Sequence, residues 1–287
     1  MTPSEYCLTR TGGPGTDLYY ALWHLPAAQR DAVTALHAIT IEIADTAREC
    51  HEPQLAHTKL GWWREEIERA GRERASHPAT QALAPWLRQD LIPLPPLMQF
   101  IDATTEDIGP VRVACFDELR THRQRTAGVV AALAAGLLGA RDATALEQAR
   151  TLGTLHAITR TLAEAGADLR AGRVYLPADE LARFGLVECE LPGADDTDAW
   201  RRFMEHQIER LARLYDDALA SVPAAHTEVL LPDLVLAALQ QALLEEIRAI
   251  DYRVLSQRVA LTPLRRLWIA WHTHRRLRRS KPAPRLG

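Results

Sequence analysis

The chain has 287 residues, of which 47% are hydrophobic and 25% charged, and its 37 acidic and 34 basic side chains give a formal net charge of −3. This composition excludes a disordered chain and a collagen-like repeat. Four widely spaced cysteines without a CxxC pair indicate neither a zinc site nor a disulfide framework. With no apolar run of about 18 residues and no signal peptide, we expect a cytoplasmic protein without a nucleic-acid partner.

Apolar residues recur at helical spacing in nearly every segment, whereas the alternation typical of strands is brief and rare. The pattern therefore predicts an all-α chain. Prolines stand at several predicted helix starts, where a first-turn proline costs no helical hydrogen bond. The predicted helices are Ala27–Glu49, Gln54–Arg69, Pro78–Gln89, Pro93–Ile108, Phe116–Leu138, Ala143–Ala165, Asp196–Ser221, Pro232–Ile250 and Pro263–Leu277.

The chain is predicted to form one helical domain over residues 1–271, followed by a basic tail over residues 272–287. Pro192–Asp198 is the best linker candidate, but the composition does not change around it. Neither a phosphate-cradling glycine loop nor a GxSxG elbow is present, which argues against nucleotide-binding and hydrolase functions.

The first candidate site lies on the predicted helix Ala27–Glu49. Asp45 and Glu49 are four residues apart and share a face, and Glu42 lies one turn earlier. Carboxylates in this pattern could hold Mg²⁺, which usually keeps several waters that bridge to phosphates. The alternative is a solvated acidic stripe on an amphipathic helix.

The second candidate site lies at the end of the predicted helix Ala143–Ala165. Glu164 and Asp168 are again four residues apart, and Arg173 and Tyr175 follow directly. Carboxylates that hold Mg²⁺ beside guanidinium groups that grip phosphate oxygens would form a diphosphate site. The alternative is a helix end with its basic residues placed to suit the helix dipole.

Four segments, in this order and at family-like spacing, resemble bacterial squalene/phytoene synthases of the squalene and hopanoid branch. They are YYALWHLPAAQRDAVTALHAI, KLGWWREEIE, GADLRAGRVYLPADELARFGL and VLSQRVALTPLRRLWIAW. The resemblance implies an isoprenoid-synthase-like helical bundle around a central cavity. It also implies a transferase that joins two prenyl diphosphates head to head. Mg²⁺ held by two Asp-xxx-Asp pairs would neutralise the leaving diphosphate in a site that excludes water.

The match to the family is incomplete at both aspartate-rich motifs. Where the family reads approximately Arg-Glu-Val-Asp-Asp-x-x-Asp-Glu, this chain has Ala44 and Arg48 at the outer aspartates and keeps only the middle one. The family's Asn-xxx-Asp-xxx-Asp becomes Arg160, Glu164 and Asp168. These changes remove negative charge and add positive charge, so we expect weaker Mg²⁺ binding and an anion site at the two arginines.

The resemblance, together with the changed charges at Arg48 and Arg160, gives the candidate site residues their expected roles. Asp168 and Tyr175 are the expected catalytic residues, and Arg173, Arg48 and Arg160 are expected to bind the substrate. The expected metal ligands are Asp45, Glu49, Glu164 and Asp168. The implied cofactor is Mg²⁺, and the sequence does not decide whether NADPH is used.

Three hypotheses of function remain open. The first is a prenyltransferase that condenses farnesyl or geranylgeranyl diphosphates despite its altered metal site. The second is a non-catalytic family member: a prenyl or lipid-binding protein, an assembly factor, or the partner of an active paralogue. The third is a diverged enzyme that binds its substrate's anion through Arg48 and Arg160.

The C-terminal segment is strongly basic and surrounds the aromatic run Leu267–Trp271. Attraction to anionic lipid would place the protein peripherally on the inner face of the membrane. The alternative is a solvated helix end followed by a frayed tail. The basic residues are Arg265, Arg266, Arg275, Arg276, Arg278, Arg279, Lys281 and Arg285.

Overall fold

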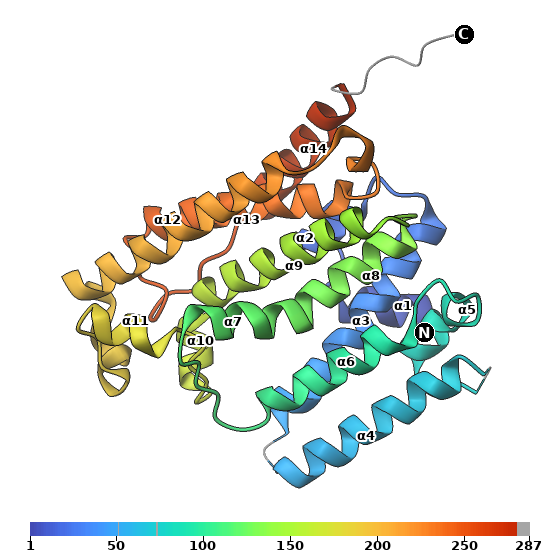
Figure 1. Cartoon of the computed structure of the whole chain (residues 1–287), viewed down its shortest axis with the longest axis horizontal. Helices are drawn as coiled ribbons and strands as arrows, with labels where there is room; N and C mark the ends of the chain where they lie inside the picture. The colour runs from blue at the N-terminus through green and yellow to red at the C-terminus, as the bar shows by residue number, and fades with distance from the viewer. Residues whose placement is uncertain (51, 73, 280–287) are drawn as a thin grey trace.

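A computed structural model describes residues 1–50, 52–72 and 74–279 (Figure 1). Within these ranges the chain forms helices and no strand, with one isolated bridge between Arg112 and Val174. The α-helices are α1 (Pro3–Arg10), α2 (Asp17–Leu22), α3 (Ala27–Glu49), α4 (Pro53–Ala70), α5 (Pro78–Arg88), α6 (Leu94–Thr104), α7 (Phe116–Arg123), α8 (Val129–Leu137), α9 (Ala143–Ala163), α10 (Ala165–Arg170), α11 (Ala178–Arg183), α12 (Asp198–Ala220), α13 (Leu231–Ala249) and α14 (Pro263–Arg279).

Three 3₁₀ helices and one π-helical turn complete the secondary structure: η1 (Thr105–Asp107), η3 (Glu188–Asp196) and η4 (Ala224–His226) are 3₁₀, and η2 (Gln124–Gly128) is the π-helix. The all-α prediction is thereby confirmed. Helix α3 has the predicted bounds, and the other long helices begin and end within a few residues of theirs. The predicted helix Phe116–Leu138 is interrupted, because η2 separates α7 from α8.

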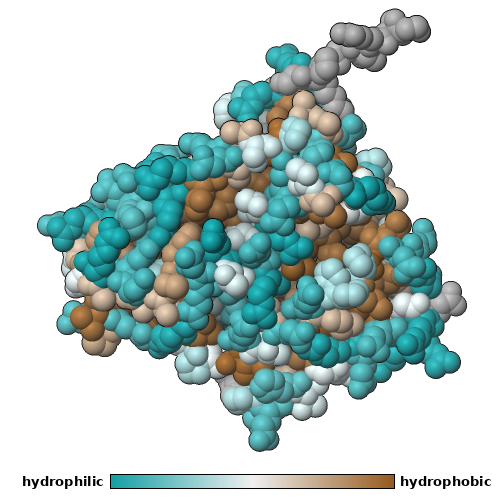
Figure 2. All heavy atoms as spheres, in the orientation of Figure 1, coloured by the Kyte–Doolittle hydropathy of each residue, from teal (hydrophilic) through white to brown (hydrophobic). Residues whose placement is uncertain are grey.

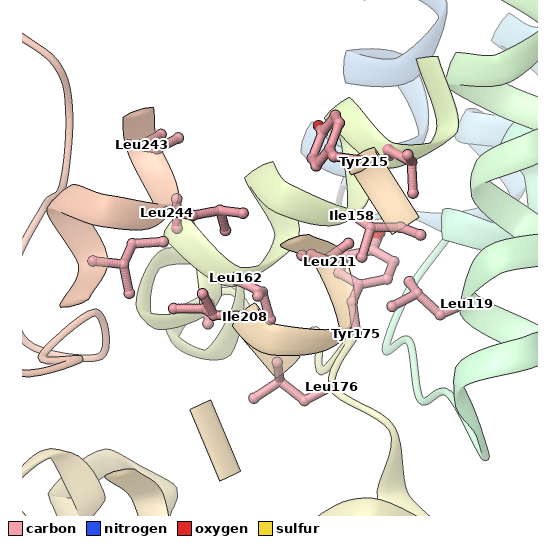
Figure 3. Close-up of a cluster of buried hydrophobic side chains, with 14 of the residues drawn as sticks. Leu119, Ile158, Leu162, Tyr175, Leu176, Ile208, Leu211, Tyr215, Leu243 and Leu244 are labelled. Atoms are coloured by element: carbon pink, nitrogen blue, oxygen red, sulfur yellow. The ribbon is translucent and has the colours of Figure 1, made fainter. Parts of the chain in front are cut away.

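The long helices pack into two large hydrophobic cores. One core joins α9, α12 and α13, and contains the fully buried Trp200, Phe203 and Tyr215. Figure 3 shows Tyr175 in this core beside Leu119, Ile158 and Leu211. The second core joins α3 to α4, α5, α6 and α8. Most of the visible face is hydrophilic, and hydrophobic side chains reach it in patches between the helices (Figure 2).

Helices α8 and α9 approach each other closely because a glycine lies at their contact. A Cβ on Gly153 would lie 2.4 Å from the Cβ of Ala131 and 2.8 Å from the carbonyl oxygen of Ala127. Real Cβ atoms do not approach other atoms so closely, so a larger residue here would push the helices apart. This contact joins the two cores and holds α9 against the chain segment that carries η2.

The linker candidate and the predicted start of the basic tail both fall within helical structure. The linker candidate Pro192–Asp198 overlaps η3 and the start of α12, and Asp195 within it is buried. Its carboxylate accepts hydrogen bonds from the backbone N–H groups of Leu255 (3.1 Å) and Ser256 (2.7 Å), which explains why this polar segment is ordered. The boundary predicted at residue 272 lies within α14. Residues 280–287 of the predicted tail lie outside the described residues.

Candidate functional site

Six side chains from four parts of the chain meet at one end of α3, and we call them the arginine–aspartate cluster. Helix α3 contributes one residue, η1 one and α7 one, and α10 with the segment after it contributes three. Three of the six are guanidinium groups and two are carboxylates. The cluster consists of Arg48, Asp107, Arg123, Asp168, Arg173 and Tyr175.

Tyr175 lies at the centre of the cluster and is buried. Its hydroxyl donates a 2.6 Å hydrogen bond to Asp107. The guanidinium carbon of Arg123 lies 4.2 Å from the centre of the Tyr175 ring, and that of Arg48 lies 6.0 Å from it. Burial, together with the charge of Asp107, raises the pKa of the phenol. Tyr175 is therefore neutral at physiological pH, and its ring contacts the guanidinium groups.

Arg48 stands where a squalene/phytoene synthase would be expected to carry an acid, and it faces acids. Burial alone would lower its pKa, but Tyr175, Asp107 and Asp168 together raise it. Burial raises the pKa of Asp168, and Arg48 opposes that rise. The positive charge of Arg48 thus favours the ionised form of Asp168.

Arg173 connects the cluster to the end of α3. Its Nη1 donates a 3.2 Å hydrogen bond to the carbonyl oxygen of Arg48, and its Nε lies 3.6 Å from a carboxylate oxygen of Asp168. The two buried Nε atoms of Arg123 and Arg173 have no hydrogen-bond partner among the described residues. A buried N–H donor without a hydrogen-bond partner is costly, so these two donors leave the cluster with unused capacity to bind an acceptor.

The interior beside Asp168 is nearly full. A cavity of about 10 Å³ borders Asp168, Arg173 and Tyr175, with Leu191 and Leu255 among its apolar walls. This is space for about one water molecule. A larger cavity of about 450 Å³ lies elsewhere, between α1, α2 and the first turns of α3.

Two of the carboxylates retained in the first motif, Glu42 and Asp45, contact α1. Arg10 forms an ion pair with Asp45 and a 2.7 Å ion pair with Glu42, which also accepts a hydrogen bond from the hydroxyl of Tyr6. Glu49 is exposed at the last residue of α3. Two of the three acids therefore share the single positive charge of one arginine from the N-terminal helix.

The second motif lies across the end of α9 and α10. Glu164 caps α9 and pairs with Arg160 one turn earlier, and both side chains are largely exposed. Asp168 is buried within the cluster, close enough to Glu164 for that charge to raise its pKa further. The structure thus brings Arg48, Arg173, Asp168 and Tyr175 together and leaves Arg160 with Glu164 at the rim.

The predicted magnesium ligands do not form a fitting donor set. Among the described residues, no three His, Cys, Asp or Glu side chains are arranged to hold a metal ion. Asp45, Glu164 and Asp168 each face an arginine. A guanidinium group repels Mg²⁺ and occupies the oxygen atoms that the ion requires. The metal assignment of these residues stays a prediction.

Three residues of the site were not found from the sequence. Asp107 and Arg123 reach the cluster through tertiary packing, and Arg10 reaches the first motif from a helix that was not predicted. Helix α1 does carry a start signal, because Thr2 and Glu5 form a capping box with a proline at the first helical position. No comparable local signal marks Asp107 or Arg123.

Comparisons with known proteins agree with this fold. A family model described as squalene/phytoene synthase matches residues 12–265. The phytoene synthase of Arthrospira platensis is 28% identical over 273 residues, covering 88% of this chain and 86% of that protein. The 15-cis-phytoene synthase of Synechocystis sp. is 27% identical over 288 residues, covering 93% and 84%.

Solved structures show the same helical arrangement. A dehydrosqualene synthase in complex with a ligand superposes with a TM-score of 0.82 at 18% identity, covering 96% of this chain and 97% of that one. Squalene synthase HpnC from Alicyclobacillus acidocaldarius gives a TM-score of 0.71 at 22% identity, covering 87% and 94%. With a family model that spans most of its length, the chain belongs to the squalene/phytoene synthase family of isoprenoid metabolism.

Proposed function

We propose that this chain is a diverged family member that binds a prenyl diphosphate through arginines, without a Mg²⁺ cluster, and does not condense two such molecules. The observation that carries the proposal is the position of Arg48, whose guanidinium group faces Asp168, Asp107 and Tyr175. A fixed internal cation at this place competes with a divalent ion for the same carboxylates.

The charge balance of the cluster supports anion binding. Three guanidinium groups oppose two carboxylates, and the buried Nε–H groups of Arg123 and Arg173 make no hydrogen bond to a described residue, although the latter lies 3.6 Å from Asp168. Arginine matches phosphate oxygens in a bidentate way, and charge-assisted bonds of this kind are among the stronger ones in proteins. The diphosphate would bind where the partly exposed Arg48 and the exposed Arg160 reach solvent.

The same arrangement argues against the family reaction. Ionisation of a prenyl diphosphate develops charge on the leaving group, and in the family this charge is expected to be neutralised by metal ions. Asp45 and Glu164 are already paired with Arg10 and Arg160, so a metal would have to break both pairs before it could bind. A protein of this kind would hold or hand over a prenyl diphosphate, for example to an active paralogue.

The test is the affinity of the full chain for farnesyl diphosphate in excess EDTA, measured by titration calorimetry. Arg48→Asp removes one cation and adds one anion at the cluster, so we expect binding to weaken by a factor of at least about 100. Arg213→Asp, at a largely exposed position on α12, is the matched control and should bind like the unaltered chain. Equal binding by both variants would contradict the arginine site.

Turnover separates the proposal from the transferase hypothesis. The protein is incubated with Mg²⁺ and farnesyl or geranylgeranyl diphosphate, and pyrophosphate release is followed. We expect release no faster than for the Glu164→Ala, Asp168→Ala double variant. Release well above that variant would show an active prenyltransferase, with the acids of the second motif serving its chemistry.

A further inference from the structure

Helix α14 turns a row of large apolar side chains toward solvent. Leu264 is 80% exposed, Trp268 60% and Trp271 41%, which places them among the most exposed large hydrophobic residues of the chain. Their spacing of four and three residues puts all three on one side of the helix, and Arg275 continues the row. Figure 1 shows α14 at the edge of the molecule, near the C-terminus.

The opposite side of α14 is fixed to the body of the protein. Ile269, Ala270 and Thr273 are buried against α13 and α2. Arg266 on this side forms a 2.6 Å ion pair with Asp17 of α2. The His274 ring packs 4.7 Å from that of His24. The outward row is therefore held in place and is not the exposed side of a loose helix.

All charged side chains of α14 are basic. Pro263–Arg279 contains six arginines and no acidic residue. Two of the arginines pair with acids of the protein body, Arg265 with Glu246 and Arg266 with Asp17. The guanidinium carbon of Arg275 lies 5.1 Å from the centre of the Trp271 ring. The end of the helix thus presents positive charge beside exposed indole rings.

We propose that this outward face of α14, defined by Leu264, Trp268, Trp271 and Arg275, docks on an anionic lipid bilayer. Indole rings prefer the region of the lipid headgroups, where one part of the ring meets hydrocarbon and the N–H meets water. Arginines around them attract acidic headgroups. A helix with an apolar face flanked by basic side chains lies parallel to the membrane surface, at the boundary between headgroups and hydrocarbon. No helix within residues 1–50, 52–72 and 74–279 is long and apolar enough to span a bilayer, so the contact is peripheral.

The experiment is flotation of the full chain with vesicles of phosphatidylglycerol and phosphatidylcholine, or of phosphatidylcholine alone, in the absence of any prenyl diphosphate. We expect binding to the anionic vesicles only, and weaker binding as the salt rises from about 0.05 to 0.5 M. Because no diphosphate is present, the outcome is independent of the proposed anion site. Binding to neither vesicle, or equal binding to both, would overturn the proposal.

Variants separate the apolar row from charge alone. Trp268→Ala combined with Trp271→Ala keeps every arginine, and we expect its partition onto anionic vesicles to fall at least about tenfold. Trp62→Ala removes a tryptophan that is 39% exposed on α4 and should bind as the unaltered chain does. Both substituted rings of α14 are exposed, so circular dichroism should show an unchanged fold. Undiminished binding by the folded double variant would refute docking through this face.

Discussion

Replacing Arg48 by methionine tests whether this side chain is the counter-charge of the cluster. The substitution keeps much of the aliphatic length of the side chain and removes the guanidinium group. Asp168 is then left in its buried position with Arg173 at 3.6 Å and the weaker influence of Arg123 as its remaining positive charges. Because burial already raises the pKa of Asp168, loss of Arg48 should raise it further.

The magnitude follows from the remaining contacts. Removing one partner of a buried ion pair costs about 3–5 kcal/mol. Arg48 acts on Asp168 through its charge, is partly exposed and leaves the Arg173 pair in place, so we expect a smaller loss, about 2 kcal/mol near neutral pH. An acid whose pKa is higher in the folded state lowers the stability as pH rises through that pKa. The stability lost in Arg48→Met should therefore increase with pH, by at most about 1.4 kcal/mol per pH unit. It should decrease at low pH, where Asp168 is protonated.

The assay is urea unfolding followed by circular dichroism at about pH 5 and about pH 8. Arg160→Met is the matched control, since its ion pair with Glu164 is largely exposed and contributes at most about 1 kcal/mol. At the higher pH, we expect Arg48→Met to lower the free energy of unfolding more than Arg160→Met does. At the lower pH, the two variants should lower it by similar amounts. The same loss at both values would refute the role of Arg48 as the partner of Asp168.

Three further predictions concern the body of the protein. Gly166→Ala places a Cβ 2.2 Å from the carbonyl oxygen of Leu255, so calorimetry should show a loss of about 3 kcal/mol or more, and a neutral result would contradict the packing of α10. Glu66 is fully buried. Burial alone would raise its pKa, but the hydrogen bonds that its carboxylate accepts, first of all from Thr80, lower the pKa to about 2. The ionised Glu66 therefore stabilises the fold above about pH 4.5, and this stabilisation is lost as the pH falls toward about 2. The free energy of unfolding of Glu66→Gln should depend less on pH in this range, and an acid-unfolding curve like that of the unaltered chain would contradict this role of Glu66. Cys189 is exposed and should react quickly with a thiol reagent, whereas Cys7, whose pKa burial raises to about 11, should react only on unfolding.

The long helices could be predicted because their apolar residues recur clearly at helical spacing and because several of them begin with a proline in the first turn. Helix α3 has the predicted bounds, Ala27–Glu49. Short helices were missed where eight or fewer residues give too few repeats of the period, as in α1 and α2. The π-helix η2 was missed because one wider turn does not alter the apolar pattern of the residues that flank it.

The candidate site was predictable only where its residues lie close together in the sequence. Asp168, Arg173 and Tyr175 follow one another and meet in the cluster. The carboxylate of Asp107 accepts its hydrogen bond from Tyr175, 68 residues away in the sequence, and no sequence spacing indicates a contact at that separation. Arg10 likewise reaches Glu42 across 32 residues. What the sequence could not show is which charge each acid faces.

The most direct measurement for the central claim is the dissociation constant of farnesyl diphosphate with the unaltered chain, determined in excess EDTA and again in excess Mg²⁺. If Arg48 supplies the charge that a metal would supply, the two constants should agree within about twofold. Binding that appears only with Mg²⁺, at least about tenfold tighter than in EDTA, would contradict a site built on arginines.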